Sequence, residues 1–111
     1  MSVAGKSIRL GGVITHVVVF WTDKPHGEAQ ARLLAGAQEL LPQIPGVQEF
    51  RSGVAVPSPR GAVDDSFSVA ISMSFADQAT ADSYQSHPLH MRFVEEYFKP
   101  NSRRFVVYDF G

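Results

Sequence analysis

The chain has 111 residues, 44% of them hydrophobic and 19% charged, and its formal net charge is −1. This length fits one domain, and the composition excludes a disordered chain. The near-neutral charge indicates no surface for nucleic acid or for an anionic membrane. Because the sequence contains no cysteine, disulfides, thiolate zinc sites and cysteine nucleophiles are excluded as well.

Residues 1–12 are mostly polar and end in two glycines, so we expect a flexible N-terminal arm there and a folded domain over residues 13–111. No apolar run has the length of a signal peptide or of a membrane span, and we therefore expect a cytoplasmic protein. We also expect no bound cofactor, because the sequence has neither a phosphate-binding glycine loop nor a dinucleotide fingerprint.

The first half of the domain is predicted to form a strand, a helix and a second strand. Ile14–Trp21 is rich in valine and aromatic residues on both faces, which is typical of a strand covered on both sides. Glu28–Leu41 carries leucine and alanine at helical spacing, and Pro42 ends this helix. Val47–Val56 is a weaker strand, in which Gly53 indicates a bulge or a bend.

The second half begins with the clearest alternation in the sequence, Phe67–Phe75, which predicts a strand with one apolar face. Asp77 is the expected N-cap of a helix that runs to about Gln85. A second helix is expected to start at Pro88, with His87 or Ser86 as its cap, and to end before Pro100. The last strand is expected at Arg104–Phe110 and is again apolar on both faces.

This order of elements, β-α-β-β-α-β, predicts an α+β ferredoxin-like fold in which helices cover one face of a four-stranded antiparallel sheet. The other sheet face has no cover within the chain, although the first and last strands are apolar on both sides. An uncovered apolar face is typical of an interaction surface, and we predict a homodimer that forms through it. The alternative is a monomer with unusually apolar strands.

One short segment, Tyr84–His90, gathers side chains capable of chemistry. His87 and His90 are three residues apart and could share a metal ion, but no third ligand lies nearby, so we predict no metal site and assign His87 to the helix cap. His90 lies in a first helical turn, whose dipole disfavours imidazolium, and a neutral imidazole is a suitable general base. The Tyr84 hydroxyl could stabilise an oxyanion. The alternative is a tyrosine packed at a helix junction with its hydroxyl in water.

Two further polar residues lie on predicted strands. His16 is in the middle of the first strand on an apolar face, where a histidine is more often a core residue than a catalyst. Asp109 is near the end of the last strand. It could orient His16 or His90, or simply mark the solvated strand end.

Five segments together resemble the stress-responsive dimeric α/β-barrel (Dabb) domain family: Thr15–Phe20, Ile44–Val47, Arg60-Gly61, Tyr84–His90 and Val107–Phe110. The resemblance covers about Ile14–Phe110. It implies the same ferredoxin-like fold and a dimer in which two sheets form an α/β barrel across the interface. It leaves the activity open, because many members have none established and others are linked to stress tolerance or to stable assembly.

One member of that family is a cofactor-free polyketide cyclase, and its motif implies a catalytic pair, Tyr84 and His90. It also implies a pocket between helices and sheet, lined by His16, Val18, Phe20, Val69, Ile71, Val107 and Asp109. This sequence departs from the cyclase at two positions, with Val69 in place of a pocket histidine and Arg92 in place of a small glycine. Arg92 would narrow the pocket or supply a charge for an anionic ligand.

The leading hypothesis is a Dabb-type homodimer that binds or transforms a small carbonyl-containing metabolite. The alternatives are a non-catalytic stress-associated or assembly protein, and a cofactor-free polyketide cyclase or monooxygenase.

Overall fold

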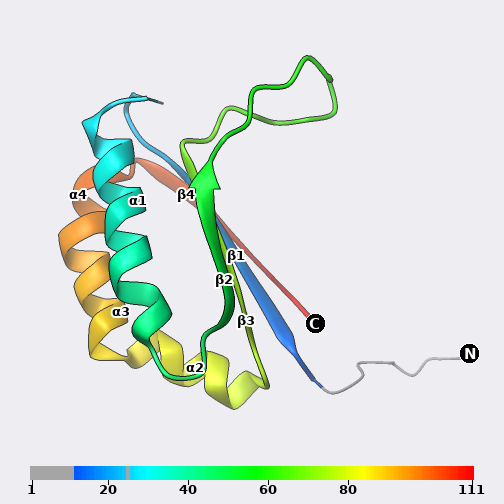
Figure 1. The fold of residues 1–111 in the computed structure, drawn as a ribbon, viewed down its shortest axis with the longest axis vertical. Helices are drawn as coiled ribbons and strands as arrows, with labels where there is room; N and C mark the ends of the chain where they lie inside the picture. The colour runs from blue at the N-terminus through cyan, green and yellow to red at the C-terminus, as the bar shows by residue number, and fades with distance from the viewer. Residues whose placement is uncertain (1–11, 25) are drawn as a thin grey trace, which may run out of the picture.

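The structure, a computed structural model, describes residues 12–24 and 26–111 (Figure 1), so all but the last residue of the predicted arm lies outside the described residues. The strands are β1 (Ile14–Trp21), β2 (Gln48–Val54), β3 (Val69–Phe75) and β4 (Arg104–Phe110). The helices are α1 (Glu28–Leu40), α2 (Gln78–Ser86), α3 (Pro88–Phe93) and α4 (Lys99–Asn101). A 3₁₀ turn, Leu41–Gln43, follows α1, and a π-helical segment, Val94–Phe98, joins α3 to α4.

The strands form one antiparallel sheet in the order β2-β3-β1-β4, which confirms the predicted ferredoxin-like fold. β1 lies in the middle of the sheet, and β4 is an edge strand. In this register His16 of β1 lies opposite Met73 of β3 on one side and opposite Asp109 of β4 on the other. Directly opposite residues share a face of the sheet, so the side chain of Asp109 is on the same face as that of His16.

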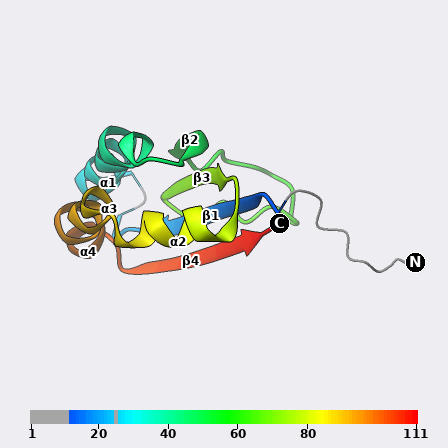
Figure 2. The ribbon, with the colours of Figure 1, turned by 90° about the horizontal axis from the view of Figure 1, so that it is seen from below.

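The helices lie on one face of the sheet (Figures 1 and 2), over the even-numbered side chains of β1 and the odd-numbered side chains of β3. This face holds the hydrophobic core, in which Leu33 of α1 and Val69 of β3 are completely buried. The cover is incomplete over β4. Phe105 and Val107 share the helix-facing side of the sheet, yet they remain 51% and 43% exposed. The helical layer therefore leaves a gap along this edge.

The last helical segment does not end before Pro100, and that prediction was wrong. α3 passes into the π-helical segment, and helical backbone continues through Pro100 to Asn101. Pro100 lies in the first turn of α4. Pro100 directly follows the π-helical segment, whose hydrogen bonds already depart from the i→i−4 pattern that a proline would interrupt. A proline therefore does not end the helical segment at this position.

The second strand also differs from its prediction, because it is shorter and its irregularity lies elsewhere. The bulge falls between Gln48 and Arg51, where Glu49 has a φ of 51°, while Gly53 pairs regularly with Ala70. A non-glycine residue with a positive φ is uncommon, and the sequence carries no signal for it at this position. β3 likewise begins at Val69 rather than Phe67.

The helical layer depends on one close approach between α1 and the π-helical segment. Gly36 is buried on α1, and a Cβ atom built there would lie 2.3 Å from Cγ of Tyr97. Such a distance is far below van der Waals contact, so α1 can lie this close to the π-helical segment only because residue 36 has no side chain.

We predict that Gly36→Ala destabilises the protein although alanine is the better helix former. The overpacking against Tyr97 should cost about 1–3 kcal/mol of the free energy of unfolding, measured by urea denaturation. Gly61→Ala is the matched control, because nothing lies within 4 Å of a Cβ at that position. A Gly36→Ala variant as stable as wild type would contradict this packing.

Candidate functional site

The junction between α2 and α3 brings Tyr84 and His90 together. His87 has extended backbone angles, φ −69° and ψ 141°, so it ends α2 and serves as the N-cap of α3. Its Nδ1 atom accepts a hydrogen bond of 3.1 Å from the backbone N–H of Leu89, and Pro88 occupies the first turn of α3. The resulting sharp turn places the ring centroids of Tyr84 and His90 4.7 Å apart.

Tyr84 is almost completely buried, with 1% of its surface exposed. Its ring meets three others, those of His16, Phe75 and His90, at centroid distances of 5.8, 5.1 and 4.7 Å. Burial raises the pKa of the Tyr84 hydroxyl, because a phenolate would lose its hydration. The hydroxyl therefore stays protonated and is a hydrogen-bond donor at physiological pH.

His16 is held by a hydrogen bond across the sheet. Its Nδ1 atom lies 2.6 Å from Oδ1 of Asp109, the residue directly opposite on β4. The His16 side chain is 9% exposed, whereas the Asp109 side chain is 58% exposed. An ionised carboxylate can only accept, so Nδ1 of His16 carries the proton. In a neutral ring, Nε2 of His16 is then the free acceptor.

A cavity of about 140 Å³ lies between the helices and the sheet at the gap along β4. We call it the apolar cavity. It is lined by His16, Val18, Phe20, Gln85, His90, Val94, Phe98, Phe105 and Val107. Its polar side chains are the two imidazoles and the amide of Gln85, and all the others are aliphatic or aromatic.

The two imidazoles of the apolar cavity differ in their surroundings. Burial lowers the pKa of His90, and the neighbouring His16 lowers it further, while a hydrogen bond with the backbone of Gln85 acts in the opposite direction. The His90 ring is therefore uncharged at neutral pH, because its reference pKa of 6.5 is already below 7. Among the described residues no carboxylate is paired with it, in contrast to His16.

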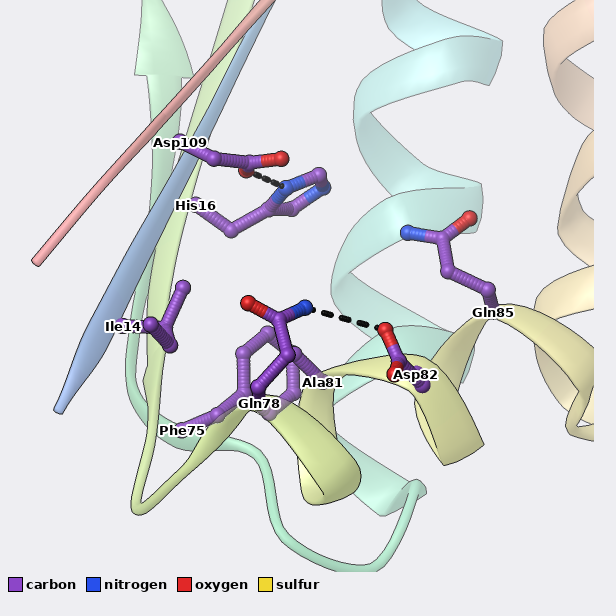
Figure 3. Close-up of a pocket in the computed structure, with 8 residues that line it drawn as sticks. All are labelled: Ile14, His16, Phe75, Gln78, Ala81, Asp82, Gln85 and Asp109. Carbon is purple, nitrogen blue, oxygen red and sulfur yellow. Dashed lines mark hydrogen bonds and ion pairs between the residues drawn. The ribbon is translucent and has the colours of Figure 1, made fainter. Parts of the chain in front are cut away.

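A smaller cavity of about 80 Å³ lies next to the apolar cavity and shares His16 and Gln85 with it. We call it the polar cavity. Figure 3 shows His16 and Asp109 on one side of it and Gln78, Asp82 and Gln85 of α2 on the other. The remaining lining residues are Ile14, Phe75 and Ala81. The His16 ring thus separates a mostly apolar space from a mostly polar one.

The predicted catalytic and pocket residues lie in different places. His16, Val18, Phe20, Val107 and His90 line the apolar cavity. Asp109 lines the polar cavity, and Tyr84 packs against both imidazoles without lining the apolar cavity.

The structure does not bring Val69, Ile71 or Arg92 to the apolar cavity. β3 is an interior strand, so Val69 and Ile71 are 0% and 3% exposed in the core among residues of α1. Arg92 lies on the outside of α3, where its Nε donates to Glu96 at 3.2 Å. It neither narrows the cavity nor supplies a charge to it.

Sequence reasoning missed four lining residues: Gln85, Val94, Phe98 and Phe105. Phe105 alternates with Val107 and Asp109 on β4, and this spacing was a usable signal. The other three depend on where α2 ends and on the π-helical segment, and neither is apparent from residue spacing.

The described residues hold neither a metal-binding cluster nor a membrane-spanning helix. Over residues 12–24 and 26–111, no group of three or more histidine, aspartate or glutamate side chains could hold a metal ion. Within the same ranges no helix is both long enough and apolar enough to cross a bilayer.

The fold and the cavity define a ferredoxin-like α+β domain with a histidine-lined pocket between its helices and its sheet. The chain belongs to the stress responsive A/B barrel domain (Dabb) family, whose profile matches residues 14–111. The resemblance found in the sequence is thereby confirmed. No curated protein matches the chain.

Solved structures of similar proteins share this fold. A Dabb family protein from Mesorhizobium loti is 34% identical, with a TM-score of 0.75 over 90% of this chain and 96% of that one. A hydroxynitrile lyase from Passiflora edulis is 20% identical, with a TM-score of 0.74 over 90% and 93% of the two chains. A dimeric ferredoxin-like protein of unknown function from Thermobifida fusca is 17% identical, with a TM-score of 0.72 over 97% and 98%.

The lowered pKa of His90 predicts a pH dependence of stability. The unfolded chain takes up a proton at this residue near its reference pKa of 6.5, but the folded protein does so only at lower pH. The free energy of unfolding should therefore fall as the pH decreases from about 6.5 towards the folded pKa, and stay level above 6.5 as far as this group is concerned. Urea denaturation of wild type and of His90→Gln between pH 5 and 8 measures this effect.

The variant should lose stability less steeply than wild type below about pH 6.5. His26→Gln, a change at an exposed loop residue, should keep the wild-type slope. Equal slopes for wild type and His90→Gln would show that the ring is not desolvated.

Proposed function

We propose that this protein is an enzyme that binds a small carbonyl-containing metabolite in the apolar cavity and removes a proton from the carbon beside the carbonyl. One observation carries the proposal: a partly open apolar cavity has two imidazoles in its wall, one kept neutral by burial and one bound to a carboxylate. An uncharged imidazole can accept a proton, and the surrounding apolar side chains would hold a small organic ligand.

The roles follow from the surroundings of each group. His90 would be the general base, because its ring is neutral at physiological pH and no carboxylate of the described chain is paired with it. Tyr84 would donate a hydrogen bond to the developing enolate oxygen, because its buried hydroxyl stays protonated. This role requires a small movement of Tyr84 towards the apolar cavity, because its ring packs against His16 and His90 without lining the cavity itself. Returning the proton from His90 to the same carbon restores the ketone.

Asp109 and His16 would connect this chemistry to solvent. Asp109 is more than half exposed, contacts His16 and lines the polar cavity, whereas His16 lines both cavities. A proton could therefore pass between water and the apolar cavity through the His16 ring. Asp109 would act as a positioning residue that fixes the ring orientation and its tautomer.

The hydroxynitrile lyase from Passiflora edulis supports the proposal that this protein is an enzyme, because it is an enzyme with the same fold. A non-catalytic stress-associated or assembly role remains the competing proposal. The two proposals predict different effects of replacing His90. Under the non-catalytic role, the replacement would not change the rate at which a carbonyl compound loses a proton.

Proton abstraction can be tested without knowing the natural substrate. In D₂O the wild-type protein should catalyse exchange of deuterium into butanone at the carbons beside its carbonyl, followed by proton NMR. His90→Gln should lower the exchange rate by about 100-fold, a typical contribution of a general base. Tyr84→Phe should lower it as well, because the enolate oxygen loses its donor.

His26→Gln is the control, since it removes an exposed imidazole away from the cavity and should leave the rate unchanged. If His90→Gln and wild type exchanged butanone equally fast, the assignment of the base would be overturned. No exchange above buffer in wild type would favour the non-catalytic role.

We also propose that two copies of the chain pair through the sheet face that the helices leave open. Val17, Val19, Val106, Tyr108 and Phe110 share this face, and Tyr108 and Phe110 are 59% and 62% exposed. Such a patch is typical of an interface. The proteins from Thermobifida fusca, Bacteroides fragilis and Jannaschia sp. with this fold are described as dimeric, which supports the proposal.

Light scattering should give twice the 12.2 kDa mass of the chain at micromolar concentration. Tyr108→Glu should shift the protein to the monomer, because it places a charge in the apolar patch. Met91→Glu is the matched control: Met91 is 57% exposed but lies on α3, on the opposite side of the sheet. A dimer that tolerates Tyr108→Glu as well as Met91→Glu would exclude this interface.

A further inference from the structure

The lining of the apolar cavity is ordered along its length. On the sheet side, the register of β1 and β4 places the row Val18 and Val107 next to His16, and the row Phe20 and Phe105 beyond it. Successive rows of a strand on one face are about 7 Å apart. The cavity wall therefore changes from imidazole to valine to phenylalanine in one direction along the sheet.

The helical side of the cavity repeats this order. His90, Val94 and Phe98 all line the cavity and follow each other at intervals of four residues. Phe98 reaches the same end as the two strand phenylalanines, with ring centroids 5.6 Å from Phe20 and 4.9 Å from Phe105. The cavity thus has a histidine end, a valine middle and a phenylalanine end, each built from both walls.

The π-helical segment accounts for this alignment. In a regular α-helix, side chains four residues apart drift by about 40° around the axis, so a third residue in the series would turn away from the cavity. Val94–Phe98 is π-helical, and its wider turn reverses that drift. His90, Val94 and Phe98 can therefore face the same space, and a π-helical turn at a ligand site is a common arrangement.

The volume of the cavity matches a ligand with one ring. Its volume is about 140 Å³. In another protein, an engineered apolar cavity of about 150 Å³ binds benzene. The rings of Phe20, Phe98 and Phe105 meet edge to face in pairs, with interplanar angles of 62° and 88°, so a planar ring could join them in the same manner.

We propose that the apolar cavity selects a carbonyl compound that carries a single aromatic ring. The ring lies at the phenylalanine end and the carbonyl at the histidine end. In this assignment, the orientation of the carbonyl group rests on the proposed function. The selection of an aromatic ring depends on the cavity alone. A linear ketone of equal carbon number has no ring with which to make the edge-to-face contacts.

The probe is 4′-fluoroacetophenone, whose binding to the full chain is followed by ¹⁹F NMR, with octan-2-one as a competitor of the same carbon number. The aryl ketone should bind about tenfold more tightly than the linear ketone, the magnitude expected for well-placed aromatic contacts. Phe105→Leu should reduce this preference while leaving a cavity of similar size. Phe105 is half exposed, so the fold should tolerate the change.

Val107→Trp should block the cavity and lower the affinity for 4′-fluoroacetophenone about tenfold or more, because Val107 lies in its middle. Val56→Trp is the matched control, since Val56 is 77% exposed on the loop after β2 and outside the cavity. Equal affinities for the two ketones, no binding of the aryl ketone, or unchanged binding in Val107→Trp would each overturn the inference.

The two proposals fail separately. If butanone exchanges deuterium in a His90-dependent manner but the aryl ketone is not preferred, the substrate class is wrong and the proposed function stands. If the aryl ketone is preferred and Val107→Trp removes its binding, but no ketone exchanges deuterium, the cavity is a binding site for aryl compounds and the proposed catalysis is wrong.

Discussion

The hydrogen bond between His16 Nδ1 and Asp109 Oδ1 connects the architecture of this protein to its candidate chemistry. It joins the central strand β1 to the edge strand β4 at a directly opposed pair of residues. The bond fixes the tautomer and the orientation of a ring that separates the apolar cavity from the polar cavity. A register shift of one residue would move Asp109 to the other face of the sheet and leave a buried imidazole without a carboxylate.

Two histidines that lie near the same tyrosine acquire different properties because their surroundings differ. His16 has a carboxylate partner that reaches solvent, whereas His90 is desolvated and feels the neighbouring imidazole, so its pKa falls. The incomplete helical cover over β4 leaves room between them. The cavity is therefore a consequence of strand order: an edge strand receives less cover than an interior one.

Most of the fold could be predicted from the sequence. The predicted bounds of the first and last strands are those of β1 and β4, because apolar residues on both faces and flanking breakers mark them clearly. The turn between Tyr84 and His90 was predicted from His87-Pro88, because a capping residue there directly precedes a proline suited to a first helical turn. The neutral state of His90 was also predicted, but the cause differs: burial and His16, rather than the helix dipole, lower its pKa.

The remaining features depend on tertiary context. Residue spacing does not distinguish an α-helical from a π-helical turn at Val94–Phe98, and so the alignment of His90, Val94 and Phe98 was not foreseen. The burial of Val69 and Ile71 depends on which strand α1 covers, and the outward direction of Arg92 on how α3 is rotated. Local pattern determines the elements, whereas the lining of a cavity is determined by how those elements pack.

The ¹⁵N spectrum of the imidazoles at pH 7, recorded while butanone is added to the full chain, tests the central claim most directly. The chain has four histidines, so the resonances can be assigned one by one with single variants. Our account predicts that His90 is uncharged and that the signals of His16 and His90 move together on titration, while that of the exposed His26 stays in place. A charged His90, or a titration in which neither His16 nor His90 responds, would contradict it.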